Sequence, residues 1–276
     1  MFAKFHWRSL TLGLVALALA GVASTASATH SWNGYHWART SNPFTIKLGN
    51  NLSGAAWTAD GSVNHLTVAS SDWSTSDVLT TTVVTGLAKS RNCRPTAGRV
   101  EVCNATYGNT GWLGIATIWL ADGIHISQGT VKLNDTYFNT ATYNTPAWRQ
   151  LVICQEIGHT FGLDHQDTNF DNANLGTCMD YTNNPLGPPD NEHPNQHDYD
   201  ELDVIYNPLY GGHLDSTTTI GQPITNKAAA DIDSGNPSNW GQLVKSSQGG
   251  RTAIYEMDLG VGHKLVTFVI WALEGR

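Results

Sequence analysis

The sequence is poor in charged residues and especially in basic ones. Only 14% of its 276 residues are charged, compared with about 25% in an average protein, and 15 lysines and arginines stand against 23 aspartates and glutamates. The formal net charge is −8. Such a chain lacks the basic surface that attracts nucleic acids and anionic membranes. The composition therefore argues against partners of those two kinds.

Long apolar runs are also missing, apart from one near the N-terminus. Two basic residues precede an apolar run at residues 10–20, and an A-x-A cleavage site follows at residues 26–28. This order predicts a secretion signal over residues 1–28, and the run is too short to cross a membrane comfortably. We expect a soluble extracellular protein that begins near Thr29. Loss of the two basic residues takes its net charge from −8 to −10.

Cysteine is scarce, with four residues and no C-x-x-C pair, which disfavours a cysteine-based zinc site. An even number in an exported chain favours two disulfides, and three pairings are possible. We favour Cys93–Cys103, which closes a short loop, and Cys154–Cys178, which ties a predicted helix to a later turn. A free buried thiol at Cys154 is the alternative.

Periodicity and turn signals predict a mixture of strands and helices followed by a small β-rich module. Residues 111–121 and 124–133 alternate on either side of Asp122-Gly123, which is a hairpin signal. The other expected strands are 43–48, 80–85 and 99–103, and the expected helices are 60–73, 148–161 and 197–206. Residues 166–197 are polar and predict a loop. We divide the chain into residues 1–28 (signal), 29–210 (main domain) and 211–276 (linker and β-rich C-terminal module).

Residues 155–165 form the most informative pattern, Gln-Glu-Ile-Gly-His-Thr-Phe-Gly-Leu-Asp-His. Positions i and i+4 share a helix face, so the side chains of Gln155 and His159 converge. The second glycine can adopt a positive φ and end the helix in a turn that returns His165 to the same point. A catalytic zinc takes three protein ligands and one open position. The spacing predicts such a site with Glu156 beside it, and a buried helix with unrelated polar residues is the alternative.

This pattern resembles the H-E-x-x-H-x-x-G-x-x-H motif of metzincin zinc proteases, with glutamine at its first position. Cys178-Met179-Asp180-Tyr181 resembles the Met-turn of the same clan, whose methionine lies beneath the metal. The order of the expected elements over residues 43–210 is similar to that of secreted matrixin-type and reprolysin-type proteins. The resemblance implies an α+β, metzincin-like zincin fold. That fold has a twisted mixed sheet, an active-site helix and a Met-turn, with the C-terminal module outside the resemblance.

The resemblance also implies a function and roles for the residues. Glu156 would be the general base, and His159 and His165 would bind one catalytic Zn²⁺. Tyr181 would bind zinc or steady the oxyanion, with an aromatic packing role as the alternative. A protein or peptide substrate would lie along an edge strand at residues 111–121. The chain is thus expected to be a secreted, monomeric zinc endopeptidase, and the alternative is a secreted binding protein on an inactivated protease fold.

Glutamine at the first motif position leaves three readings of the metal site. Gln155 could ligate through its amide oxygen, a weaker donor than imidazole, with Tyr181 or water completing the shell. A different histidine could replace it, and the candidates are His125, His193 and His197. In the third reading the site binds no metal. We favour the first, because the glutamate, the two motif histidines and the methionine remain.

A polar loop and three further histidines complete the candidate residues. Oxygen-rich side chains in the loop could bind Ca²⁺, but their spacing matches no calcium loop, so a solvated loop is favoured; they are Asp167, Asp171 and Asn174. The histidines are expected to be surface or packing groups; they are His30, His36 and His65.

Overall fold

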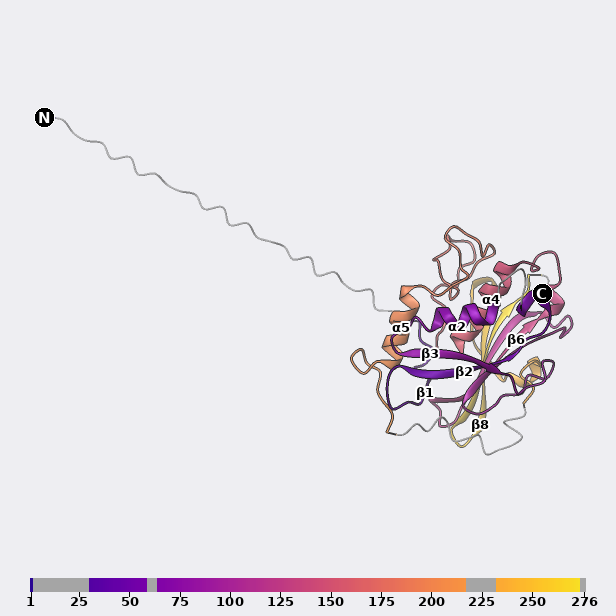
Figure 1. Cartoon of the computed structure of the whole chain (residues 1–276), viewed down its shortest axis with the longest axis horizontal. Helices are drawn as coiled ribbons and strands as arrows, with labels where there is room; N and C mark the ends of the chain where they lie inside the picture. Colours follow the sequence, from indigo (N-terminus) through magenta and orange to yellow (C-terminus); the bar gives the residue numbers. More distant parts are fainter. Residues whose placement is uncertain (2–29, 59–63, 217–231, 274–276) are drawn as a thin grey trace.

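The computed structural model describes residues 1, 30–58, 64–216 and 232–273 (Figure 1). The predicted secretion signal lies outside these residues apart from Met1, as does the start of the helix expected at 60–73. Part of the linker expected after residue 210 also lies outside them. Within the described residues, no helix is both long and apolar enough to cross a membrane.

A nine-stranded mixed sheet dominates the structure. Its main path runs in the order β3-β2-β4-β6-β5-β9-β8-β7, and β1 also pairs with β6. The neighbours from β3 to β6 are parallel, and those from β6 through β5 and β9 to β7 are antiparallel. The strands are β1 (His36–Trp37), β2 (Phe44–Asn51), β3 (Leu79–Thr85), β4 (Arg99–Ala105), β5 (Trp112–Leu120), β6 (His125–Asn134), β7 (Gln242–Ser246), β8 (Thr252–Gly260) and β9 (His263–Trp271).

In the described part of the chain, three helices of more than two turns accompany the sheet, and α2 and α4 lie on the same side of it (Figure 1). Helix α4 packs on β5 and β6, and α2 packs on α4 and β3. Large apolar side chains from these elements form the main core. The helices are α1 (Ala55–Thr58), α2 (His65–Trp73), α3 (Asp135–Phe138), α4 (Pro146–His159) and α5 (Gln196–Tyr206), with short 3₁₀ turns η1 (Pro237–Asn239) and η2 (Gln248–Gly250).

Local sequence signals explain where the two helices nearest the motif begin. Thr145 caps α4 by accepting a hydrogen bond from the Trp148 backbone, and proline occupies the first helical turn, where its missing N–H costs nothing. Helix α5 begins with a capping box in which Asn195 and Asp198 bond each other's backbone. The carboxylate of Asp198 also lies at the positive end of the helix, where it is stabilising.

The α+β class and most expected elements are confirmed, including the hairpin between β5 and β6. Both favoured disulfides are confirmed as well. Cys93 is bonded to Cys103 and Cys154 to Cys178, each with Cα atoms 5.9 Å apart. The second disulfide joins α4 to the predicted Met-turn.

The late strands join the central sheet. Strand β9 pairs antiparallel along the whole of β5, from Trp112 opposite Trp271 to Leu120 opposite Lys264. The expected boundary at residue 210 therefore separates two segments of one hydrogen-bonded sheet. The prediction that residues 111–121 form an exposed edge strand is wrong, because β6 and β9 pair with the two edges of β5. Every residue of β5 is buried.

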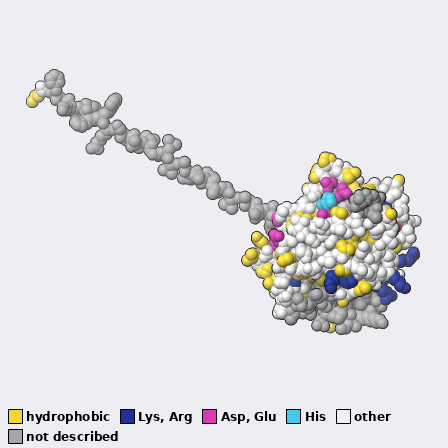
Figure 2. All heavy atoms as spheres, in the orientation of Figure 1, with side chains coloured by type: hydrophobic (Ala, Val, Ile, Leu, Met, Phe, Trp, Pro, Cys, Tyr) yellow, Lys and Arg dark blue, Asp and Glu magenta, His cyan; other side chains and the backbone are white. Residues whose placement is uncertain are grey.

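The face of the molecule shown in Figure 2 is mostly uncharged, and its basic side chains gather at one side. This agrees with the low charge of the sequence. The described surface thus presents no broad basic area on that face.

Candidate metal centre at the end of helix α4

The motif residues lie in the last turns of α4 and in the turn that follows. Gly162 has a φ of 97°, as its position at the end of the helix predicted. A Cβ atom there would lie 2.0 Å from the backbone oxygen of Tyr35, so glycine is needed for both conformation and space. Beyond this turn the chain returns His165 to the end of the helix.

The two motif histidines meet through their Nε2 atoms, which are 3.1 Å apart. The Nδ1 atom of His159 lies 2.8 Å from the Leu163 carbonyl oxygen, and that of His165 lies 3.2 Å from an Asp164 carboxylate oxygen. Both partners only accept, so each Nδ1 carries a proton and each neutral ring turns an Nε2 lone pair toward the other. Two facing lone pairs repel, and a metal ion between them relieves that repulsion, although the Tyr181 hydroxyl, 2.7 Å from His165 Nε2, competes for one of them.

Burial keeps these rings neutral. It lowers the pKa of His159 well below its ordinary value, and the neighbouring His165 lowers it further. Burial also lowers the pKa of His165, although Asp164 opposes this. The donors of a tetrahedral zinc, each bonded at about 2.0–2.1 Å, lie roughly 3.3 Å apart. The two histidines therefore fit a zinc ion.

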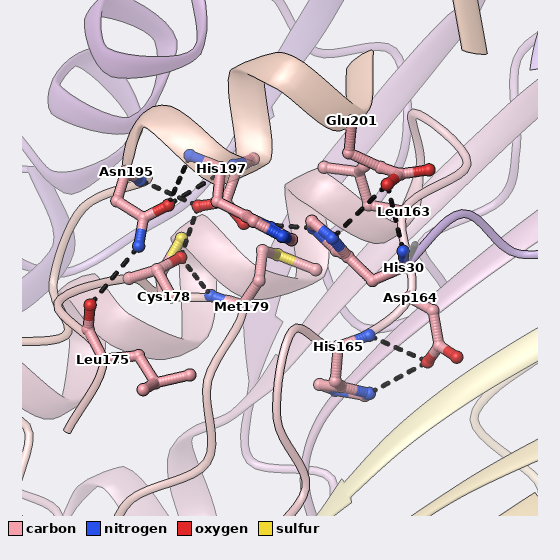
Figure 3. Close-up of polar contacts among 12 residues, drawn as sticks. His30, Leu163, Asp164, His165, Leu175, Cys178, Met179, Asn195, His197 and Glu201 are labelled. Carbon is pink, nitrogen blue, oxygen red and sulfur yellow. Dashed lines mark hydrogen bonds and ion pairs between the residues drawn. The ribbon is translucent and has the colours of Figure 1, made fainter. Parts of the chain in front are cut away.

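Asp164 supports this arrangement from the other side of His165. Burial alone would raise the pKa of Asp164, but hydrogen bonds and charge from His165 and from the Lys245 ammonium lower it. Figure 3 shows its carboxylate accepting from both the backbone and the ring of His165. A carboxylate on the outer nitrogen orients the ring and makes it a better metal donor.

Gln155 occupies the first motif position, and its amide is turned toward the predicted Met-turn. Its Nε2 donates to the backbone oxygen of Cys178 at 2.8 Å. Its Oε1 is buried and has no hydrogen-bond partner among the residues that the structure describes. A buried carbonyl oxygen without a partner is costly, and a metal ion would satisfy it. Ligation through this oxygen stays a prediction.

Glu156 points from α4 toward β5. Its carboxylate accepts a hydrogen bond from the Ala116 backbone, and burial raises its pKa well above the ordinary value. Its second oxygen, Oε2, has no partner in the described part of the chain. A Cβ atom on Gly114 would lie 2.9 Å from Oε1, so a glycine on β5 makes room for the carboxylate.

The predicted Met-turn lies under α4. Met179 is fully buried, and its Sδ would lie 2.6 Å from a Cβ atom on Gly158. Its backbone N–H donates to Thr177, and Asn195 at the start of α5 donates to the Leu175 carbonyl (Figure 3). The turn is thus held between two helices.

Tyr181 reaches the histidine pair. Its hydroxyl lies 2.7 Å from His165 Nε2, to which it donates in the neutral form. Burial raises the pKa of this phenol well above its ordinary value. The ring also stacks on Phe170, with ring centres 5.2 Å apart. Both readings of Tyr181, as a polar participant and as a packing aromatic, thus have a structural basis.

Strand β9 covers the histidine pair. Phe268, fully buried on β9, lies parallel to the His159 ring with a centroid distance of 4.4 Å and an interplanar angle of 7°. Thr252 on β8 hydrogen-bonds Tyr181. The most exposed of the five predicted site residues is His165, at 8%. Strands β8 and β9, which follow the expected boundary at residue 210, therefore close the site.

The three substitute ligands suggested by the sequence have other partners. His193 bonds Asp72 at 2.8 Å, and His197 stacks on His30. His125 bonds two aspartates in a separate cluster that includes His36. The structure thus groups His159 and His165 with Tyr181 and gives no support to a replacement histidine.

The possible calcium residues make local bonds. Asp167 accepts from backbone groups of its own turn, and the Asn174 amide donates to two backbone carbonyls. Asp171 lies in the same loop, where its backbone N–H donates to Asn169. Calcium binding stays a prediction.

Comparison with known proteins adds no family to this picture. No protein-family model matches the chain, and no curated protein sequence matches it. The metzincin resemblance therefore rests on the motif and turn residues described above.

Proposed function

We propose that this protein is an exported zinc-dependent endopeptidase whose site is closed by its own strand β9. The observation that carries the proposal is the pair of facing Nε2 atoms, 3.1 Å apart, on neutral rings held by outer hydrogen bonds. Two disulfides in the chain are consistent with an oxidising compartment and so support export.

The buried carboxylate of Glu156, on the same helix as His159, supports hydrolysis. A bound zinc supplies Lewis-acid polarisation and an activated water at neutral pH. In this proposal Glu156 moves the proton; the role is supported by its Oε2, which has no partner among the described residues, and by burial, which raises the pKa of its carboxyl. In the same proposal Tyr181 donates to a developing oxyanion, a role that its hydrogen bond with His165 supports.

Strand β9 lies where an extended substrate was expected to bind. It runs antiparallel along β5, and Phe268 covers His159. Four large side chains of β8 and β9 are buried in the main core, and each contributes about 1.5–3 kcal/mol to the folding free energy; they are Ile254, Val266, Phe268 and Ile270. Substrate access thus requires local separation of β9 from β5.

The same observation favours a second candidate, a secreted binding protein without catalytic activity. The amide of Gln155 bonds the Cys178 carbonyl, and β5 is paired on both edges. In this reading the motif helix is structural and the site contributes no hydrolysis.

Metal content and Glu156-dependent hydrolysis of extended peptides distinguish the two candidates. Untagged mature protein is compared with Glu156→Gln, which keeps the shape of the side chain but removes the base. Endopeptidase activity predicts zinc that is lost in His159→Asn, and hydrolysis that is absent in Glu156→Gln. Gln155→His should strengthen zinc binding by about tenfold or more, since loss of even an outer contact costs about 10–100-fold.

A variant that weakens the packing of β9 provides the decisive test. Phe268→Ala should increase hydrolysis if β9 limits access to the site. If Phe268→Ala and Gln155→His together yield no hydrolysis that depends on Glu156, the endopeptidase proposal fails and the binding protein stands.

A further inference from the structure

Four potential metal ligands from three separate parts of the chain converge beside the β5–β6 hairpin. His36 lies on β1 and His125 begins β6, and the parallel pairing of these strands places the two residues directly opposite each other. His213 and Asp215 follow α5. One ligand atom from each of the four residues lies within 4.8 Å of all the others.

Backbone pairing fixes the segment after α5 against the N-terminal part of the chain. The backbone N–H of Asp215 donates to the Arg39 carbonyl at 2.8 Å, and its Oδ2 accepts from the Arg39 N–H at 2.9 Å. Residues i and i+2 of an extended segment point to the same side. His213 and Asp215 consequently face the same point, with Nε2 and Oδ1 3.2 Å apart.

Hydrogen bonds on the outer nitrogens orient the two strand histidines. His36 Nδ1 donates to the Gly34 carbonyl at 2.7 Å, and His125 Nδ1 donates to Asp122 at 2.6 Å. Their Nε2 atoms thus point into the cluster, as those of metal-bound histidines do when a carbonyl or carboxylate holds the other nitrogen.

The Nε2 atom of His36 is the most informative in the cluster. The residue is 3% exposed, and this nitrogen has no hydrogen-bond partner within the described ranges. Near it, His125 Nε2 lies 3.0 Å from Asp215 Oδ1. A charged His125 could satisfy Asp215, but it would leave His36 Nε2 buried and unpaired, which is costly. A metal ion satisfies all four donors together.

We propose that His36, His125, His213 and Asp215 hold a structural zinc ion. Zinc takes imidazole nitrogens and carboxylate oxygens at about 2.0–2.2 Å, so its donors lie roughly 3.3–3.5 Å apart. The cluster already has pairs at 3.0 and 3.2 Å. Four protein ligands close the coordination shell, as in structural rather than catalytic sites.

The ion would tie together β1, the β5–β6 hairpin and the chain that leaves α5. The site is open to solvent on one side, because the His213 side chain is 59% exposed and that of Asp215 11%. Zinc can therefore enter the folded protein. This proposal is independent of the endopeptidase proposal, since it uses none of the α4 residues.

The test is the zinc stoichiometry and affinity of the untagged mature protein and its variants. His213→Asn should lose one zinc equivalent, or bind it at least about 100-fold more weakly, because it removes a direct ligand. His193→Asn is the matched control, since His193 also pairs with an aspartate and is 49% exposed. This control should bind zinc as the wild type does.

A milder variant checks that misfolding is not the cause of any loss of zinc. Asp122→Asn keeps all four ligands and changes the group behind His125, on a side chain that is 55% exposed and also accepts from the Ile124 and His125 backbones. It should weaken zinc binding by about 10–100-fold. The proposal is overturned if His213→Asn and His193→Asn bind zinc alike, or if all zinc is lost in His159→Asn. A single zinc that is lost in His213→Asn but kept in His159→Asn would support this site and refute the endopeptidase site.

Discussion

Phe268→Ala tests whether β9 closes the candidate metal centre. Phe268 is fully buried, stacks on His159 at 4.4 Å and packs edge-on against Trp32 at 6.2 Å. Replacing such a phenylalanine with alanine costs about 3–5 kcal/mol of folding free energy. Domains are typically stable by about 5–15 kcal/mol, so the variant is expected to remain folded in water.

The same loss of packing should lower the free energy needed to open the site locally. The contacts of Phe268 are broken when β9 separates from β5, so the variant lowers the free energy of that opening by about the same 3–5 kcal/mol. Each 1.4 kcal/mol is a factor of ten. Zinc bound by His159 should therefore be released to a chelator roughly 10² to 4 × 10³ times faster.

Phe138→Ala provides the matched control. Phe138 is also fully buried, but it lies on α3 and packs against Trp57 with ring centres 5.0 Å apart. Its removal should cost a similar folding free energy in urea unfolding, with little effect on zinc release. The measurement is chelator-driven release in a His213→Asn background, which removes the second proposed zinc.

Two results would refute this reasoning. Equal acceleration in both phenylalanine variants would show that zinc escapes by global unfolding rather than by opening of β9. Unchanged release from Phe268→Ala would show that the histidines are reached by another route.

Three further predictions concern α4 and α5. Gly158→Ala should lower the free energy of unfolding in urea, because its new Cβ would lie 2.6 Å from Met179 and 2.7 Å from Trp73. The resulting overpacking costs about 1–3 kcal/mol and outweighs the gain of about 1 kcal/mol in helix propensity. A stabilised variant would contradict this. Burial raises the pKa of Glu156, so metal-free protein should lose stability as pH rises above the ordinary carboxyl value near 4.5. Glu156→Gln should remove that loss, and an unchanged slope of melting temperature between pH 5 and 8 would count against it. Asn195→Ala should cost about 0.5–2 kcal/mol in urea unfolding, because it removes the cap of α5; a loss below that range would mean that the cap contributes little.

Local signals carried much of the fold prediction. The Asp122-Gly123 turn between two alternating segments predicted the β5–β6 hairpin, and the cap and proline at Thr145-Pro146 mark the observed start of α4. The positive φ of Gly162 also followed from its place in the motif. Such features depend on residues within a few positions of one another, so the sequence displays them directly.

The prediction of a free edge on β5 was wrong because the strand that pairs with this edge lies far away in the sequence. The strand that pairs with β5 begins at residue 263, more than a hundred residues later. Alternation marks both segments as strands, but it does not state which strands are neighbours, because many pairings would bury the same apolar faces. Burial of Phe268 and its neighbours in the common core selects this pairing.

The two candidate metal sites differ in how far apart their residues lie in the sequence. His159 and His165 are six residues apart, joined by a helix end and a glycine turn, so their spacing alone predicted that they meet. His36, His125 and Asp215 are brought together only by the pairing of β1 with β6 and by the hydrogen bonds of Arg39 with the chain after α5. The sequence thus determined the helix, the turn and the meeting of the motif histidines through short-range geometry. Only the tertiary structure decided that β9 covers them and that a second histidine cluster exists, because both depend on contacts between segments that local periodicity does not pair.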